Sequence, residues 1–156
     1  MDNALKDYMR EEYNLMIGDS TSEKIKKDIG TAIPSNNNTY AVKGRDIRSG
    51  TPKEVNISEE DSAEALNPIL KEIVSGIKKA LEHTPPELSA DLVDMGLTMT
   101  GGGSLLKNID KRFSKETGLP VQIAEDPLSC VALGTGKALD QEEIDYGYDN
   151  RKEEEE

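Results

Sequence analysis

The feature that most constrains the fold is an apolar periodicity that begins after Ser58. Apolar side chains recur there at the three- and four-residue spacing of one helix face, at Leu66, Ile69, Leu70, Ile73, Val74, Ile77, Ala80 and Leu81. The pattern predicts a long amphipathic helix that supplies much of the core. Because proline lacks a backbone N–H and clashes with the preceding turn, Pro68 predicts a kink or a new helix start, with Asn67 as its cap.

Two short helices and a strand pair are predicted ahead of this long helix. Apolar residues at helical spacing favour a helix over residues 2–16, and the capping-box pair Ser20 and Glu23 favours a second helix that stops at Gly30. Alternating apolar residues near Tyr40 and Val55 indicate two antiparallel strands joined by a loop around residues 44–52.

The chain after the long helix predicts an α/β unit. Pro85 and Pro86 break the chain, and a short helix follows over residues 87–93. Residues 97–100 predict a strand, and the three glycines that follow predict a tight turn. The next residues predict a helix that stops at Gly118 and contains Leu105, Leu106, Ile109 and Phe113. A strand at 121–123 and a helix opened by residues 125–127 come next. Strands separated by helices imply a parallel, buried pair.

Charge and composition limit the possible functions. The chain has 156 residues, of which nineteen are basic (Lys and Arg) and thirty-one are acidic. Its net charge of −12 argues against a nucleic-acid partner. The chain contains no apolar run of about 18 residues, and its first residues do not resemble a signal peptide, so we expect a cytoplasmic protein. One cysteine and one histidine exclude a disulfide framework and a zinc cluster. The acidic tail over 140–156 predicts disorder.

Two groups of residues are candidates for ligand binding. Gly101, Gly102 and Gly103 lie between a predicted strand and helix, where bare backbone and a helix N-terminus suit a phosphate, a sugar or a flat base. The pattern alone also fits a structural turn. Glu23 and Lys26 share one helix face and offer a carboxylate for ribose hydroxyls and an ammonium group for a phosphate. A solvated ion-pair face explains that spacing equally well.

Two blocks of sequence resemble one family. MTGGGSLLKNID is similar to the adenosine motif of the actin and sugar-kinase ATPases, and AEDPLSCVALGTGKAL to their second connecting motif. Together they resemble the end of MreB, the family of bacterial actin-like cell-shape proteins, and the resemblance extends over residues 1 to about 140. It implies the C-terminal half of an actin-like (ribonuclease H-like) ATPase fold. Residues 1–93 would form a small helix-rich upper subdomain with a short antiparallel sheet, and residues 94–139 part of a lower subdomain with an incomplete sheet.

The resemblance also implies a function: a cell-shape-determining cytoskeletal protein that binds ATP and forms filaments. It implies that the nucleotide-binding residues are Glu23, Lys24, Ile25, Lys26, Gly101, Gly102, Gly103 and Ser104. The family's phosphate loops do not occur in this sequence, so we expect no catalytic residue and no ATP hydrolysis by the chain alone, and Mg²⁺ only in a complete cleft.

The same resemblance implies the partners. They are further copies of the chain or full-length filaments of the family, and a companion N-terminal half; direct membrane insertion is not implied. We expect apolar surface at the edge of the incomplete sheet. The alternative functions are a cap or inhibitor of filaments and a remnant of a related superfamily ATPase or kinase.

Overall fold

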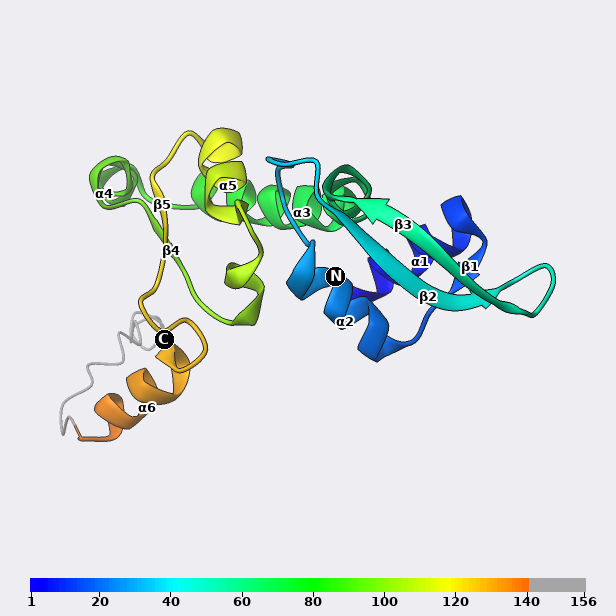
Figure 1. Cartoon of the computed structure of the whole chain (residues 1–156). Helices are drawn as coiled ribbons and strands as arrows, with labels where there is room; N and C mark the ends of the chain where they lie inside the picture. Colours follow the sequence, from blue (N-terminus) through cyan, green and yellow to red (C-terminus); the bar gives the residue numbers. More distant parts are fainter. Residues whose placement is uncertain (141–156) are drawn as a thin grey trace, which may run out of the picture.

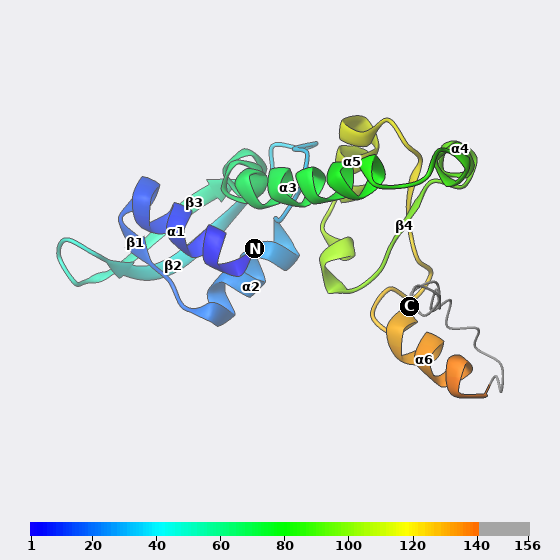
Figure 2. The same cartoon turned by 180° about the vertical axis from the view of Figure 1, so that it is seen from behind.

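One long helix, several shorter helices and short strands make up residues 1–140, which are the part of the chain that the computed structural model describes (Figures 1 and 2). The elements in order are α1 (Asp2–Tyr13), β1 (Leu15–Met16), α2 (Asp19–Asp28), β2 (Thr39–Asp46), β3 (Pro52–Ser58), α3 (Glu59–Glu82), α4 (Pro86–Met95), β4 (Leu97–Met99), the 3-10 helix η1 (Gly102–Leu105), α5 (Ile109–Thr117), β5 (Val121–Ile123) and α6 (Cys130–Asp140).

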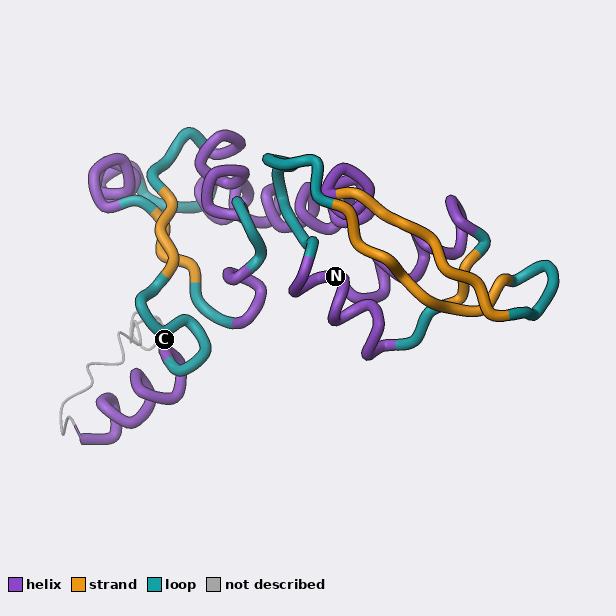
Figure 3. The backbone as a smooth tube through the Cα atoms, in the orientation of Figure 1, coloured by secondary structure: helices purple, strands orange, loops and turns teal. Residues whose placement is uncertain are grey.

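A three-stranded antiparallel sheet in the order β1-β2-β3 forms one end of the molecule, as the orange tube in Figure 3 shows. Tyr40 pairs with Ile57 and Val42 with Val55, so the predicted strand pair is confirmed. Gly44 lies where β2 passes β1, and a Cβ atom there would come within 2.5 Å of the Met16 carbonyl oxygen. A glycine is therefore required for the close approach of these two strands.

The first helix is shorter than its periodicity predicts. The helix ends at Tyr13, Asn14 adopts a left-handed conformation with φ of 50°, and Met16 belongs to β1, where it pairs with Arg45. The prediction of a helix through residue 16 is wrong because pairing with β2 outweighs the helical pattern. The predicted capping box of α2 is also wrong: Gly18 is the N-cap, no side chain caps the helix, and Glu23 forms an ion pair with Lys27 instead.

The long helix α3 runs without interruption from Glu59 to Glu82. A capping box starts it, since the Ser58 hydroxyl accepts from the Asp61 N–H and the Asp61 carboxylate accepts from the Ser58 N–H. The predicted new start at Pro68 is wrong. Asn67 lies inside the helix, and its side-chain oxygen accepts a 2.8 Å hydrogen bond from Arg112 instead of capping a helix.

The second end of the molecule contains the parallel strands β4 and β5, whose register pairs Leu97 with Val121 and confirms the predicted parallel pairing. The predicted burial of the pair is wrong, because no residue of either strand is buried and Ile123 is 39% exposed. The helix after the glycines begins later than expected: η1 covers four residues, and α5 starts at Ile109 after Asn108 reverses the chain with φ of 59°. The last helix likewise starts at Cys130 and not at residues 125–127. Local turns therefore replace the first turn of both predicted helices.

One hydrophobic cluster connects the two ends of the molecule. Its fully buried members include Leu5, Ile25 and Leu66 from the first 82 residues and Ile109 and Phe113 from α5. Most of the large apolar residues that remain exposed lie after α3, and only Ile123 of them belongs to the β4–β5 sheet; they are Leu88, Val93, Met95, Leu105, Ile123, Leu128, Val131, Leu133 and Leu139. The domain boundary at residue 93 stays a prediction.

Residues 141–156, which contain nearly all of the predicted disordered tail, lie outside the described residues. Within residues 1–140, no helix combines the length and the apolar character needed to span a membrane. The same part of the chain contains no group of three or more His, Cys, Asp or Glu side chains placed to hold a metal ion.

Candidate functional site

A cleft of about 490 Å³ lies between α2 and the glycine loop that follows β4. Glu23 and Lys26 line it from the helix, and Gly102 and Gly103 line it from the loop. The two groups of candidate residues are more than seventy positions apart in the chain, yet they border the same hollow. The remaining lining residues are Met1, Lys27, Gly30, Leu105, Leu106 and Leu128.

The loop side of the cleft is held by short hydrogen bonds. Gly101, at φ of +81°, donates its N–H to the Pro127 carbonyl at 2.7 Å, and its own carbonyl accepts a 2.7 Å bond from the buried Ser104 hydroxyl. A Cβ at Gly102 would reach the Leu128 side chain at 3.4 Å, whereas one at Gly103 would meet nothing within 4 Å. Gly103 therefore presents open backbone to the cleft. The predicted α-helix N-terminus is absent here, because η1 occupies this position.

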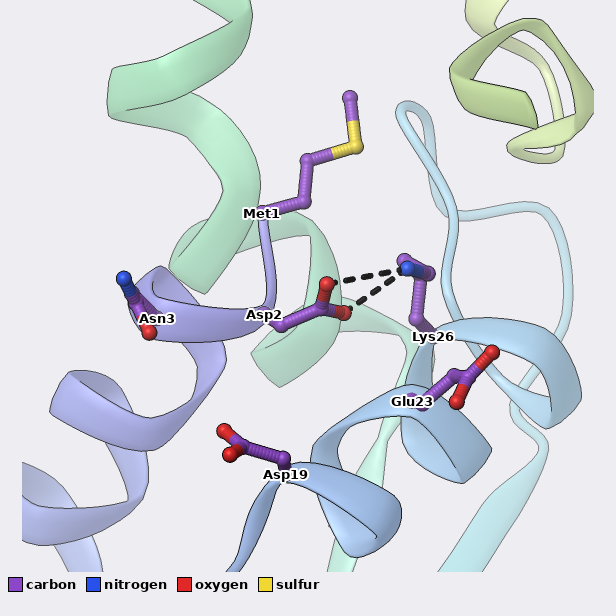
Figure 4. A pocket seen from close by; sticks show the side chains of 6 residues that line it. All are labelled: Met1, Asp2, Asn3, Asp19, Glu23 and Lys26. Carbon is purple, nitrogen blue, oxygen red and sulfur yellow. Dashed lines mark hydrogen bonds and ion pairs between the residues drawn. The ribbon is translucent and has the colours of Figure 1, made fainter. Parts of the chain in front are cut away.

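The helix side carries charge. The Lys26 ammonium lies 2.8 Å from the Asp2 carboxylate, and this hydrogen bond lowers the pKa of Asp2 (Figure 4). Glu23 forms a 2.8 Å ion pair with Lys27, whose hydrogen bond lowers the pKa of Glu23. Lys26 is partly covered, with 29% of its side chain exposed, so its charge lies at the surface of the cleft. Both carboxylates are therefore ionised at neutral pH.

A second hollow of about 490 Å³ adjoins the first and shares Met1, Glu23 and Lys26 with it. Figure 4 shows the Asp2 carboxylate turned toward the Lys26 ammonium, whereas Asp19 lines the same hollow farther from that lysine and pairs with Lys6. The two hollows together offer hydrogen-bond acceptors, the ammonium groups of Lys26 and Lys27, and the apolar side chains of Leu105 and Leu128. That combination suits a ligand with hydroxyl groups and a flat apolar portion.

The structure separates the sequence candidates into three groups. Glu23, Lys26, Gly102 and Gly103 line the cleft. Gly101 and Ser104 fix the conformation of the loop but do not line the cleft. Ile25 is fully buried in the hydrophobic core. Lys24 is exposed and does not border the cleft.

Sequence reasoning missed several lining residues, of which Leu128 and Gly30 are the most informative. A Cβ at Gly30 would clash with the Lys26 carbonyl oxygen, so a glycine is required where the chain leaves α2 at the cleft. Gly30 could have been found as a helix stop but not as part of a site. Leu128 gives no local signal, because only the tertiary fold brings it to Gly102.

Solved structures identify the class of protein. The chain superposes on MreB5 of Spiroplasma citri bound to AMPPNP with a TM-score of 0.84 and 41% identity, covering 89% of this chain and 43% of that one. The ADP-bound structure of the same protein also gives a TM-score of 0.84, at 42% identity and 87% and 42% coverage. The MamK double helical filament, at 16% identity, matches with a TM-score of 0.74 and 90% and 43% coverage, and so supports the fold alone. The fold is part of an actin-like fold.

Sequence comparisons define the family. The family model described as MreB/Mbl protein matches residues 1–145. The cell shape-determining protein MreB of Escherichia coli is 43% identical over 147 residues, which are 94% of this chain and 42% of that protein. The cell shape-determining protein Mbl of Bacillus subtilis is 41% identical over 140 residues, 89% of this chain and 42% of that protein. The chain belongs to the MreB/Mbl family, and it spans less than half the length of these relatives.

Proposed function

We propose that this chain is a cytoplasmic, cell-shape-determining protein of the bacterial actin-like cytoskeleton that binds ATP and assembles with further copies of itself. The observation that carries the proposal is the cleft, in which Glu23 and Lys26 lie opposite Gly102 and Gly103. The relatives support it by their names, since they are cell shape-determining proteins and MreB5 of Spiroplasma citri is bound to AMPPNP and to ADP.

Within the cleft, each group has a separate role. The Lys26 ammonium supplies positive charge for a phosphate, and the Glu23 carboxylate accepts hydrogen bonds from ribose hydroxyls. Gly103 allows the adenine or ribose to approach the backbone closely, because no side chain fills the space there. Leu105 and Leu128 supply apolar contact at the rim. Gly101 and Ser104 hold the loop in place, and Ile25 anchors α2 in the core, so these three residues position the binding groups without contacting the ligand.

A thermal melt of the full chain with and without Mg-ATP tests nucleotide binding. A ligand at one hundred times its dissociation constant stabilises the folded state by about 2.7 kcal/mol. For a chain of this size, that free energy corresponds to an upward shift of roughly 5–10 °C in Tm. An unshifted Tm at saturating nucleotide would contradict the binding proposal.

Two variant pairs locate the binding site. Gly103→Val places a side chain in open space, so it should leave the melt of the free chain nearly unchanged and abolish the ATP shift. Gly76→Val, on the exposed face of α3 where a Cβ also meets nothing within 4 Å, is the matched control and should keep the shift. Lys26→Met should reduce the shift, whereas Lys24→Met should not. Equal loss in both lysine variants would contradict the assignment of the cleft.

The exposed apolar residues after α3 support a companion N-terminal half as a further partner. Leu97, Met99 and Val121 line an apolar groove of about 440 Å³ together with Ile77 and Phe113. The two-stranded β4–β5 sheet leaves each strand with one unpaired edge, and such edges accept further strands. Co-purification of this chain with a separately expressed N-terminal portion of a family member tests the idea. Failure of the two to associate would refute it without affecting the nucleotide assay.

A further inference from the structure

The β2–β3 hairpin carries positive charge on an otherwise acidic chain. Residues 43–54 contain four basic and two acidic side chains, whereas the whole chain has a net charge of −12. Both acids are already engaged within the hairpin: Asp46 lies 3.2 Å from the Lys53 ammonium, and Glu54 lies 3.4 Å from Lys43. Among residues 1–140, no carboxylate forms an ion pair with Arg45 or Arg48. Two guanidinium groups are therefore available to an external anion.

Hydrogen bonds fix the turn that carries Arg48 and directly follows the strand residue Arg45. The Asp46 carboxylate accepts the N–H groups of Arg48 and Ser49, each at 2.9 Å, and these bonds with Lys53 lower the pKa of Asp46 to about 2. The Ile47 N–H donates to the Asn14 carbonyl at 2.9 Å, which ties the turn to the end of α1. A preorganised turn loses little conformational entropy when it binds a partner.

Apolar side chains accompany the two arginines. Met16 is 47% exposed and Ile47 is 42% exposed, and the Arg45 guanidinium lies against the Met16 sulfur at 3.2 Å. We call Met16, Arg45, Ile47 and Arg48 the hairpin tip. Arginine and methionine are enriched in protein interfaces, and this mixture of guanidinium and apolar groups fits an acidic peptide that also carries apolar or aromatic residues.

The C-terminal segment 141–156 has this composition. It contains eight acidic and two basic residues, so it carries half of the chain's net charge of −12. Within its first nine residues, QEEIDYGYD, Ile144, Tyr146 and Tyr148 alternate with or follow acidic residues. The segment is therefore complementary to the hairpin tip in both charge and apolar character.

The position of the hairpin tip relative to α6, after which the acidic segment begins, favours contact between different copies of the chain. The hairpin turn and α6, whose last residue Asp140 precedes the acidic segment, lie at opposite ends of the molecule in both views (Figures 1 and 2). A contact between one end of a copy and the other end of the next is heterologous, and repeated contacts of this kind give open chains or closed rings.

We propose that the hairpin tip binds the acidic segment 141–156 of a second copy of this chain. The contact specifies one mode of the self-association that belongs to the proposed function, and it does not require the nucleotide cleft. Because the attraction is between exposed charges, the association weakens as salt is raised.

Sedimentation velocity of the full-length chain tests the contact. At low ionic strength, oligomers should form that dissociate between about 0.01 M and about 1 M salt, as the Debye length falls from about 30 Å to about 3 Å. The double variant Arg45→Glu/Arg48→Glu reverses the charge of the hairpin tip. The triple variant Glu142→Lys/Glu143→Lys/Asp145→Lys reverses the charge at the start of the acidic segment. Each variant alone should associate at least about tenfold more weakly than the natural chain, since like charges now face one another. An equimolar mixture of the two variants should regain association, because each tip again meets an opposite charge.

A control and a second readout make the result decisive. Lys71→Glu/Lys78→Glu on the exposed face of α3 makes the same change in net charge as the tip variant and should leave association unchanged. The ATP-induced Tm shift of the tip variant should match that of the natural chain, so failure of this contact is distinguishable from failure of nucleotide binding. A monomeric natural chain at low salt, unaltered association in the reversed variants, or no recovery on mixing would each overturn the proposal.

Discussion

Replacing Glu59 by glutamine should strongly destabilise this chain, because the Glu59 carboxylate joins three segments that are distant in sequence. The side chain is 3% exposed, and it accepts hydrogen bonds from the Ser35 N–H at 2.9 Å, the Asn36 N–H at 3.0 Å and the Lys107 ammonium at 2.8 Å. It therefore holds the start of α3, the loop before β2 and the segment before α5 together. A buried anion with this many donors stabilises the fold only while it stays ionised.

The size of the effect follows from the pKa. The hydrogen bond from Lys107, followed by those from the two backbone N–H groups, lowers the pKa of Glu59 from 4.5 to about 2. At 1.36 kcal/mol per pKa unit, the ionised carboxylate contributes about 3 kcal/mol to the free energy of unfolding. Because the folded-state pKa is lowered, this contribution is complete above the unfolded pKa near 4.5 and is lost as the pH falls from there toward 2.

Thermal and urea denaturation at neutral pH measure the loss directly. Glu59→Gln should lower the free energy of unfolding by about 3 kcal/mol and the Tm by roughly 6–12 °C. Glu60→Gln, at the neighbouring exposed position, is the control and should change stability by less than about 0.5 kcal/mol. Lys107→Met should lower the free energy of unfolding less in the Glu59→Gln variant than in the natural chain, since the two side chains share one interaction.

The pH dependence gives an independent check. The stability difference between the natural chain and Glu59→Gln should shrink as the pH is lowered from about 4.5 to about 2, because protonation removes the charge that the substitution removes. A Tm within one degree or so of the natural chain at neutral pH, or a difference that does not change over this pH range, would show that the carboxylate network does not stabilise the fold as argued.

Two further predictions concern the core and the contact between α1 and α3. Phe113 is 1% exposed, so Phe113→Ala should lower the free energy of unfolding, measured by urea denaturation, by about 3–5 kcal/mol. Val93 is 63% exposed, so Val93→Ala should change that free energy little, and equal losses in the two variants would contradict the assigned core. Burial and the 3.0 Å hydrogen bond to Asp61 raise the pKa of Tyr13 to about 12, so ultraviolet titration should detect ionisation of that phenol well above the usual value, and an ordinary pKa near 10 would refute the contact.

Much of the local structure was predictable because its signals lie close together in sequence. The apolar period after Ser58, the alternation in the strands that became β2 and β3, and the strand pair after Gly96 are all confirmed. The glycine loop and the pair Glu23 and Lys26 were also identifiable as candidates from the residues present. What they bind stays a proposal that the Tm assay addresses.

Errors arose where a distant contact outweighed a local preference. Met16 follows the helical period of α1, but its backbone pairs with Arg45 in β2. Pro68 should interrupt a helix by its local chemistry, yet α3 continues through it while Leu66 and Leu70 on either side are fully buried. The energy of burial and strand pairing is larger than the local cost in both places.

The sequence by itself determined the order of helices and strands apart from β1 and η1, the α/β character after residue 97 and the chemical types of the candidate residues, since periodicity, glycine and charge act over a few positions. Only the tertiary structure decided that Gly103 and Lys26 border one cleft, that Lys24 does not, and that Glu59 meets Lys107. These contacts depend on how α3 packs against α1 and α5, because side chains on separate elements approach one another only when their shared apolar surfaces are buried.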